Sequence, residues 1–326
     1  MSNFKILDCT LRDGGYLNNW DFGKENIYHI IQSLIESKID YIEYGFLTNT
    51  ATDNNSLFRN LSDIKNYPIA KKCALMFNFG EVDGKKISPC FDIDIEIRIA
   101  FKKHHLDSLP KFLSILEAKN IKYSLNPMHT SLYNNNEMHK LINISNEFNP
   151  TCLTAVDTMG IMTPTDVNTI FSKFDAELNQ DTPVGFHSHN NLDLSFNNVK
   201  TLIEMDLNRE IIIDTSLLGI GRGGGMLETE ALSEFLNKKY KTSYDVLLLS
   251  KTCNDIIRPI INKQSFKDKY PYYISAKNKC HPNYATFLLN HNITDCSTID
   301  KILSSIPEDY KMIYNPDILK NVTLIK

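Results

Sequence analysis

The sequence predicts an α/β protein built as a (β/α)8 TIM barrel with a C-terminal helical extension. Short apolar runs alternate with amphipathic helical stretches, which is typical of parallel strands joined by helices. Eight such runs precede residue 216. The polar residues associated with the first and last runs, Asp13 and Asp214, are 201 positions apart over seven steps. Each step therefore takes about 29 residues, the length of one strand plus one helix.

The apolar runs are the expected strands, and they cover residues 4–10, 41–46, 73–79, 93–101, 123–126, 152–156, 184–186 and 210–215. Helical periodicity between them is clearest at 24–38 and 109–119. Another helix starts at Pro164, where we expect Thr165 to cap the N-terminus. An open doubly wound sheet is the alternative architecture for the same alternation.

The pattern changes near residue 240, where short helical stretches and turns rich in Pro and Tyr begin. We therefore divide the chain into a catalytic barrel over 1–238 and a helical extension over 239–326. Charged residues make up 23% of the chain and the net charge is −4, which argues against a nucleic-acid partner. The chain has no apolar stretch of about 20 residues and no signal-peptide pattern, and its seven cysteines form no C-x-x-C pair. We expect a cytoplasmic protein with no membrane partner, and a homodimer.

Two polar segments at the ends of expected strands could hold a metal ion. His187 and His189 alternate along one strand, so their side chains project from the same face. Asp13 ends the first strand, which only the eighth strand separates from the seventh in a closed barrel. One carboxylate and two imidazoles suit Mn²⁺, Fe²⁺, Co²⁺ or Zn²⁺, and they leave positions open for substrate. The alternative is an ion pair between Arg12 and Asp13 and a pair of hydrogen-bonded histidines at the barrel rim.

The loop after the last strand is rich in glycine over residues 219–225. Backbone N–H groups at Gly223 and Gly224 could bind an anion there, as loops after the seventh and eighth strands of such barrels often do. The alternative is that the loop is only a tight turn into the helix at 228–240.

Three segments resemble the DRE-TIM metallolyases, the superfamily of HMG-CoA lyase, 4-hydroxy-2-oxovalerate aldolase and isopropylmalate synthase. They are LDCTLRDG at 7–14, HSHN at 187–190 and GRGGG at 221–225. The resemblance covers most of residues 4–238. Two further segments, DGGY at 13–16 and KNKCHPNY at 277–284, are similar to aldolase-like proteins of bacterial surface-polysaccharide loci.

The resemblance implies that Asp13, His187 and His189 bind a divalent metal, with Mn²⁺ expected ahead of Mg²⁺, Co²⁺ or Zn²⁺. It implies an aldolase-type lyase that acts on a 2-oxo acid through a metal-bound, pyruvate-like enolate, with Arg12 facing the enolate oxygen. An acyl-CoA Claisen-type synthase and a non-catalytic metal-binding barrel are the alternatives. Polar residues at or near other strand ends either bind substrate or form a polar layer in the barrel: Glu43, Arg98, Asn126 and Asp157.

The chain departs from the family pattern at two positions. Tyr16 stands where the aldolases carry a histidine general base, and a phenol is a poorer base near neutral pH. Met226 stands where the family loop usually has asparagine, so we expect three protein ligands and no fourth. Tyr284 and Glu43 are substitute bases, but we hypothesise that His281 carries the proton within a tyrosine-rich segment that folds over the barrel mouth. The alternative is that this segment serves only as a packed helical cap.

Overall fold

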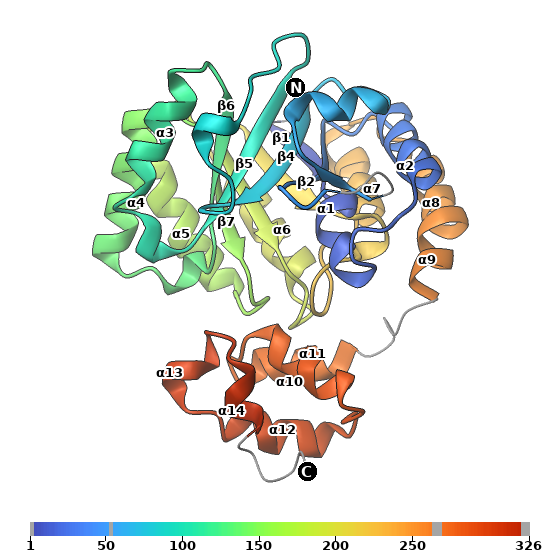
Figure 1. Cartoon of the computed structure of the whole chain (residues 1–326), viewed down its shortest axis with the longest axis vertical. Coiled ribbons are helices and arrows are strands. Elements are labelled where there is room, and N and C mark those ends of the chain that lie inside the picture. Colours follow the sequence, from blue (N-terminus) through green and yellow to red (C-terminus); the bar gives the residue numbers. More distant parts are fainter. Residues whose placement is uncertain (1–2, 52–54, 263–268, 321–326) are drawn as a thin grey trace.

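A computed structural model of the chain describes residues 3–51, 55–262 and 269–320. Eight parallel strands close into a barrel, because the order β1-β9-β8-β7-β6-β5-β4-β2 ends on a pairing of β2 with β1 (Figure 1). The predicted TIM barrel is confirmed, and the closure excludes the open sheet. The strands are β1 (Phe4–Asp8), β2 (Tyr41–Leu47), β4 (Cys73–Asn78), β5 (Ile95–Phe101), β6 (Lys122–Pro127), β7 (Leu153–Asp157), β8 (Val184–Ser188) and β9 (Ile211–Thr215).

Each barrel strand overlaps one of the predicted runs. The short β3 (Leu57–Phe58), which pairs with β2, was not predicted, because two residues are too few to show a period. Helices cover the outside of the barrel. They are α2 (Lys24–Glu36), α3 (Leu109–Glu117), α4 (Asn135–Phe148), α5 (Pro164–Glu177), α6 (Ser195–Glu204) and α7 (Thr229–Tyr240). The single turn α1 (Thr10–Asp13) instead follows β1 at the barrel mouth.

The N-terminus of α5 corrects one expectation. Thr163 caps the helix in place of Thr165: its side chain accepts from the amide of Asp166, and the Asp166 carboxylate accepts from the amide of Thr163. Pro164 occupies the first helical position, where its missing N–H costs nothing. The cap must therefore precede the proline.

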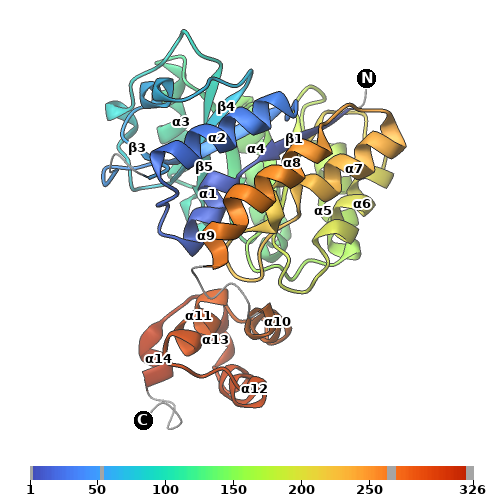
Figure 2. The same ribbon diagram turned by 90° about the vertical axis from the view of Figure 1, so that its right-hand side faces the viewer.

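The predicted C-terminal extension is helical and has two parts. The first part, α8 (Val246–Thr252) and α9 (Arg258–Asn262), runs along the barrel beside α2 and α7 (Figure 2). Its residues Leu249, Ile257 and Ile261 belong to the barrel core. The second part has a core of its own and comprises α10 (Lys269–Lys277), α11 (Pro282–Asn290), α12 (Cys296–Ser304), α13 (Glu308–Lys311) and α14 (Pro316–Lys320). The boundary at residue 238 stays a prediction.

The α10–α14 unit lies on the side of the barrel where the loops after the strands emerge (Figure 1). Nζ of Lys269 lies 2.6 Å from Oδ1 of Asp193, which is in the loop after β8. The rings of His281 and His129, which is in the loop after β6, are 6.4 Å apart. The unit therefore stands next to the face that carries the active site in barrels of this kind. None of the helices described is long and apolar enough to span a membrane.

Candidate metal centre and substrate pocket

A small pocket opens at the carboxyl ends of the strands. It contains six of the residues singled out in the sequence: Arg12, Asp13, Tyr16, Asn126, His187 and His189. The rest of its lining is Phe46, Met76, Asn78, Ala100, Met128, Val156, Thr158 and Arg222. The mixture of polar and apolar side chains in the lining suits a small polar metabolite.

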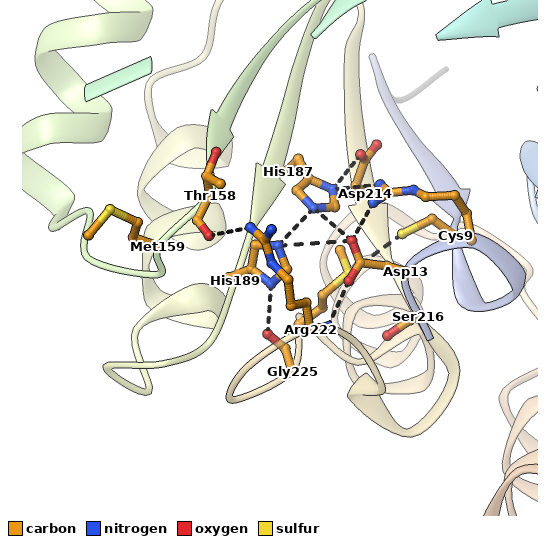
Figure 3. Close-up of polar contacts among 12 residues, drawn as sticks. Cys9, Asp13, Thr158, Met159, His187, His189, Asp214, Ser216, Arg222 and Gly225 are labelled. Carbon is orange, nitrogen blue, oxygen red and sulfur yellow. Dashed lines mark hydrogen bonds and ion pairs between the residues drawn. The ribbon is translucent and has the colours of Figure 1, made fainter. Parts of the chain in front are cut away.

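His187 and His189 face each other at the wall of this pocket (Figure 3). Nδ1 of His187 lies 2.8 Å from Oδ2 of Asp214, and Nδ1 of His189 lies 3.3 Å from the carbonyl oxygen of Gly225. Both partners are acceptors, so these contacts place a proton on each Nδ1. The two Nε2 atoms, 3.3 Å apart, then turn their lone pairs toward each other.

Asp13 completes this group of acceptors. Its Oδ2 lies 3.3 Å from Nε2 of His187 and 3.9 Å from Nε2 of His189. Its Oδ1 accepts from the backbone amide of Arg222 at 2.8 Å, and Arg12 forms an ion pair with Oδ2. Burial alone would raise the pKa of Asp13, but Arg12 and the two histidines outweigh it and hold the pKa well below its usual range.

A carboxylate oxygen and two imidazole nitrogens that all lie within 4.8 Å of one another are a donor set for a divalent cation. The neutral state of His189 fits this interpretation, because burial, together with the nearby charges of His187, Arg222 and Arg12, lowers its pKa to about 3. The contact of His187 with Asp214 is the carboxylate–histidine arrangement that orients metal-bound imidazoles. The residues therefore fit the predicted metal.

A second group, Cys9, His187 and Asp214, has the right spacing but the wrong chemistry. The Cys9 thiol donates to the carbonyl oxygen of Thr215, and burial raises the pKa of Cys9 well above its usual value. A protonated thiol is a poor ligand. The sulfur of Met226 lies 3.6 Å from this thiol, among buried apolar side chains.

Beneath the pocket, Glu43 and Arg98 form the polar layer that was the alternative to direct substrate binding. Glu43 accepts from Nε of Arg12 at 2.7 Å and from Arg98 at 3.1 Å. The same Arg98 donates to Asn126 at 3.0 Å and to Asp214 at 2.7 Å. Arg98 is only 2% exposed and thus links β2, β5, β6 and β9 across the barrel interior. Of these predicted substrate contacts, only Asn126 reaches the pocket.

Asp157 and the two loop glycines lie outside the pocket lining. The Asp157 carboxylate accepts from the amides of Ile161 and Met162, both at 3.0 Å, and so shapes the loop after β7. The amide of Gly224 donates to Asn191 at 2.6 Å. These contacts favour the tight-turn interpretation of the glycine loop, and the predicted binding roles of Asp157, Gly223 and Gly224 stay predictions.

Close approach explains one glycine of that loop. A Cβ atom at Gly221 would lie 2.9 Å from Oδ1 of Asp13 and 2.8 Å from the side chain of Met226. A larger residue would therefore push the loop away from Asp13, and with it the amide of Arg222 that binds this carboxylate.

Tyr16 and His281, the two predicted proton carriers, lie in different surroundings. Tyr16 lines the pocket, packs against Trp20 at 4.9 Å, and lies under the guanidinium of Arg222 at 5.6 Å. Desolvation raises the pKa of Tyr16. His281 is not among the lining residues. It caps α11, where its Nδ1 accepts from the amide of Asn283 at 3.2 Å, and its ring faces His129 and Tyr314.

Sequence reasoning assigned no role to Asp214 or Arg222. Asp214 was visible as a polar strand end, and its neighbour relation to His187 follows once the barrel is closed. Arg222 was visible inside the glycine loop, but nothing in the sequence shows that its guanidinium crosses to the carbonyl oxygen of Thr158, at 3.0 Å (Figure 3).

A closed barrel with two histidines and an aspartate at its carboxyl face defines a TIM-barrel protein with a candidate metal centre. The HMGL-like family model matches residues 88–256, just over half of the chain, and the chain belongs to this family. The resemblance to the superfamily of HMG-CoA lyase is confirmed.

Proteins similar to this chain are described as aldolases or as a decarboxylase. A 4-hydroxy-2-oxovalerate aldolase of Geobacillus genomosp. 3 is 24% identical over 269 residues, covering 79% of this chain and 78% of the relative. An oxaloacetate decarboxylase of Mycobacterium tuberculosis is 23% identical over 240 residues, covering 72% and 70%. The N-terminal domain of a Bacteroides vulgatus protein described as an aldolase matches with a TM-score of 0.75 and 26% identity, covering 88% of this chain and 96% of that one. These relatives support an aldolase-type lyase family.

Proposed function

We propose that this protein is a divalent-metal-dependent lyase of the aldolase type, which breaks or forms a carbon–carbon bond in a 2-oxo acid. The observation that carries the proposal is the convergence of Oδ2 of Asp13 with Nε2 of His187 and of His189 at the wall of the pocket. These three residues would hold the ion. When bound, a divalent ion supplies Lewis-acid chemistry, which polarises a carbonyl group and stabilises negative charge on its oxygen.

Arg12 would share the negative charge that develops on the enolate oxygen. It lines the pocket beside Asp13, and Glu43 fixes its Nε at 2.7 Å. A guanidinium held in place by a buried carboxylate needs little reorganisation when charge develops in the substrate. Arg98 donates a hydrogen bond to Glu43 and so helps to hold in place the carboxylate that binds Arg12.

Tyr16 would give a proton to the enolate carbon. Its side chain lines the pocket, and its raised pKa keeps the phenol protonated near neutral pH. Aldol cleavage also needs an acceptor for the hydroxyl proton of the substrate. Among the described lining residues, the other titratable acceptors are Asp13, His187 and His189, which we assign to the metal.

This lack of a free base favours a second candidate reaction, the decarboxylation of a 2-oxo acid whose carbon 4 is itself a carboxylate. The electrons of the broken bond move into the enolate, carbon dioxide leaves, and the phenol of Tyr16 donates its proton to carbon 3. No substrate proton has to be removed in this reaction. The oxaloacetate decarboxylase among the similar proteins supports the same candidate.

Activity assays of the Mn²⁺-loaded protein test these proposals. We expect metal-dependent cleavage of a 4-hydroxy-2-oxo acid and exchange of pyruvate methyl protons into deuterated water, both lost in His189→Ala. The control His139→Ala changes an exposed histidine of α4 and should stay active. Oxaloacetate turnover without cleavage of the 4-hydroxy-2-oxo acid would select decarboxylation. Thiol release from an acyl-CoA would select the Claisen synthase, and no turnover on a broad panel of oxo acids would indicate a non-catalytic barrel.

A further inference from the structure

Three nitrogen-bearing side chains at the barrel mouth have no part in the chemistry above. They are Arg222 after β9, His129 after β6, and His281 at the start of α11. We call them the rim group. They come from three segments far apart in the sequence, and His281 belongs to the helical unit outside the barrel core.

Arg222 brings a positive charge to the pocket, and no carboxylate among the described residues forms an ion pair with it. Its guanidinium donates to the carbonyl oxygen of Thr158 at 3.0 Å and lies over the ring of Tyr16. Its Nε is buried and has no hydrogen-bond partner within the part of the chain that the structure describes. A buried donor without an acceptor needs an explanation, because leaving its hydrogen bond unmade costs about 1–3 kcal/mol.

His129 presents a second buried nitrogen atom. The residue is in the left-handed region, at φ 57°, and its amide donates to Oγ1 of Thr158 at 2.8 Å. Its Nδ1 is buried and, across residues 3–51, 55–262 and 269–320, finds no hydrogen-bond partner. Nε of Arg222 and Nδ1 of His129, both without a hydrogen-bond partner among the described residues, therefore belong to residues that bind Thr158. Thr158 itself lines the pocket.

His281, at the start of α11, adds a hydrogen-bond donor from the helical unit. Its Nδ1 accepts from the amide of Asn283, so its proton is on Nε2. Burial is the main reason that its pKa falls to about 2 and that of His129 to about 4, and the charge of Arg222 lowers both further. Both rings are thus neutral donors near neutral pH. Arg222 and Lys102 supply the positive charge that each histidine senses.

We propose that the rim group is a subsite for an anionic group, a carboxylate or a phosphate, at the far end of the substrate. Arg222 supplies the charge, and the two histidines supply neutral hydrogen-bond donors. Arg222 lines the same pocket as Asp13, and its backbone amide binds that carboxylate. One small molecule in this pocket can therefore reach both the proposed metal centre and Arg222 of the rim group. The assignment of this anion to the aldehyde half of the substrate rests on the proposed function.

Calorimetry tests the subsite without catalysis, with inorganic phosphate and succinate as separate probes. We expect saturable binding of at least one probe, weakened about tenfold or more in Arg222→Gln, because a charge-assisted hydrogen bond is lost. The matched control Arg258→Gln removes an exposed arginine of α9 and should bind as the wild type does. His129→Asn keeps a residue that tolerates positive φ but shortens the side chain, and we expect weaker binding there too. Absence of binding, or equal binding by wild type and Arg222→Gln, overturns the proposal.

Kinetics of condensation with pyruvate then distinguish the two anions. Succinic semialdehyde is compared with butanal, and glyceraldehyde 3-phosphate with glyceraldehyde. We expect kcat/KM to favour one charged aldehyde about tenfold or more, with the preference lost in Arg222→Gln. The pair with the larger ratio identifies carboxylate or phosphate. Equal kcat/KM within both pairs overturns the subsite. If no aldehyde condenses, the proposed aldolase function fails, and the calorimetry alone decides whether the rim group binds an anion.

Discussion

The carboxylate of Asp214 lies 2.8 Å from Nδ1 of His187, and the same oxygen accepts from Arg98 at 2.7 Å. One side chain on β9 therefore orients a proposed metal ligand on β8 and anchors the polar layer beneath it. Burial raises the pKa of Asp214, but Arg98 and His187 outweigh burial and lower it overall. The carboxylate is thus ionised and holds the proton on Nδ1 of His187, which leaves Nε2 free for the metal.

Asp214→Asn should weaken metal binding about 10–100-fold, because the neutral amide holds the tautomer of His187 less firmly. Competition between the protein and a fluorescent chelator for Mn²⁺ measures the change in Kd. Asp175→Asn is the matched control, since Asp175 also pairs with an arginine, Arg209, but lies outside the barrel interior. An unchanged Kd in Asp214→Asn would remove Asp214 from the metal centre.

Arg98→Met should lower the free energy of unfolding by about 3–5 kcal/mol, because it leaves buried carboxylates without their cation. Glu43 and Asp214 are the two carboxylates concerned, and both are buried. Urea unfolding of the metal-free protein measures the loss. Adding Asp214→Asn to Arg98→Met removes one unpaired charge and should recover part of the stability. A loss under about 1 kcal/mol in the single variant would mean that the layer is hydrated and not buried.

The barrel and the core of the site were predictable from sequence because both follow from local periodicity. A strand puts His187 and His189 on one face, and closure of the sheet brings Asp13 beside them. The direction of a side chain at a strand end was not predictable. Asn126 points into the pocket, whereas Asp157 turns to the amides of its own loop, and only the path of that loop decides between them.

The rim of the site was beyond sequence reasoning for a different reason. His281 lies in the helical unit, whose docking on the barrel depends on tertiary contacts and not on a repeating pattern. The tyrosine-rich segment did indicate a packed cap, and Tyr284 is indeed buried, with its hydroxyl donating to backbone carbonyls of the same unit. Tyr284 is therefore not placed as a proton carrier.

Tyr16→Phe should lower kcat of the lyase reaction about 10²–10⁴-fold while leaving the Kd for Mn²⁺ unchanged, since the phenol would donate the proton and does not hold the metal. Phenylalanine keeps the ring contacts with Trp20 and Phe46, so the fold should persist. Tyr28→Phe, on the exposed side of α2, is the control. Wild-type turnover in Tyr16→Phe would refute the assignment.

Asp157 should make the protein less stable as the pH rises from about 4 to about 7. Burial raises the pKa of Asp157 to about 7, against the pull of its backbone hydrogen bonds, whereas the unfolded chain has an ordinary aspartate. The folded state therefore binds more protons in this range, and stability falls by up to about 1.4 kcal/mol per pH unit and then levels off. The free energy of unfolding of Asp157→Asn should lack this component.

Because other groups titrate too, the informative quantity is the difference in unfolding free energy between wild type and Asp157→Asn at each pH. The control Asp181→Asn changes an exposed carboxylate. A difference for Asp157→Asn that is flat from about pH 4 to about pH 7 would show that its carboxyl is already ionised throughout.

The variant His281→Asn tests whether His281 carries a proton or binds the substrate. Asparagine is a favoured N-cap, so this variant keeps the cap of α11, whereas His281→Ala loses it and should unfold about 0.5–2 kcal/mol more easily. If His281 binds the far end of the substrate, His281→Asn should raise KM for a charged aldehyde several-fold, by about 1 kcal/mol for one hydrogen bond, and leave kcat nearly unchanged. We expect this outcome, because the ring faces His129 and its pKa of about 2 makes it a weak base. A fall of kcat by about 10²-fold or more, with KM unchanged, would return His281 to the role of proton carrier.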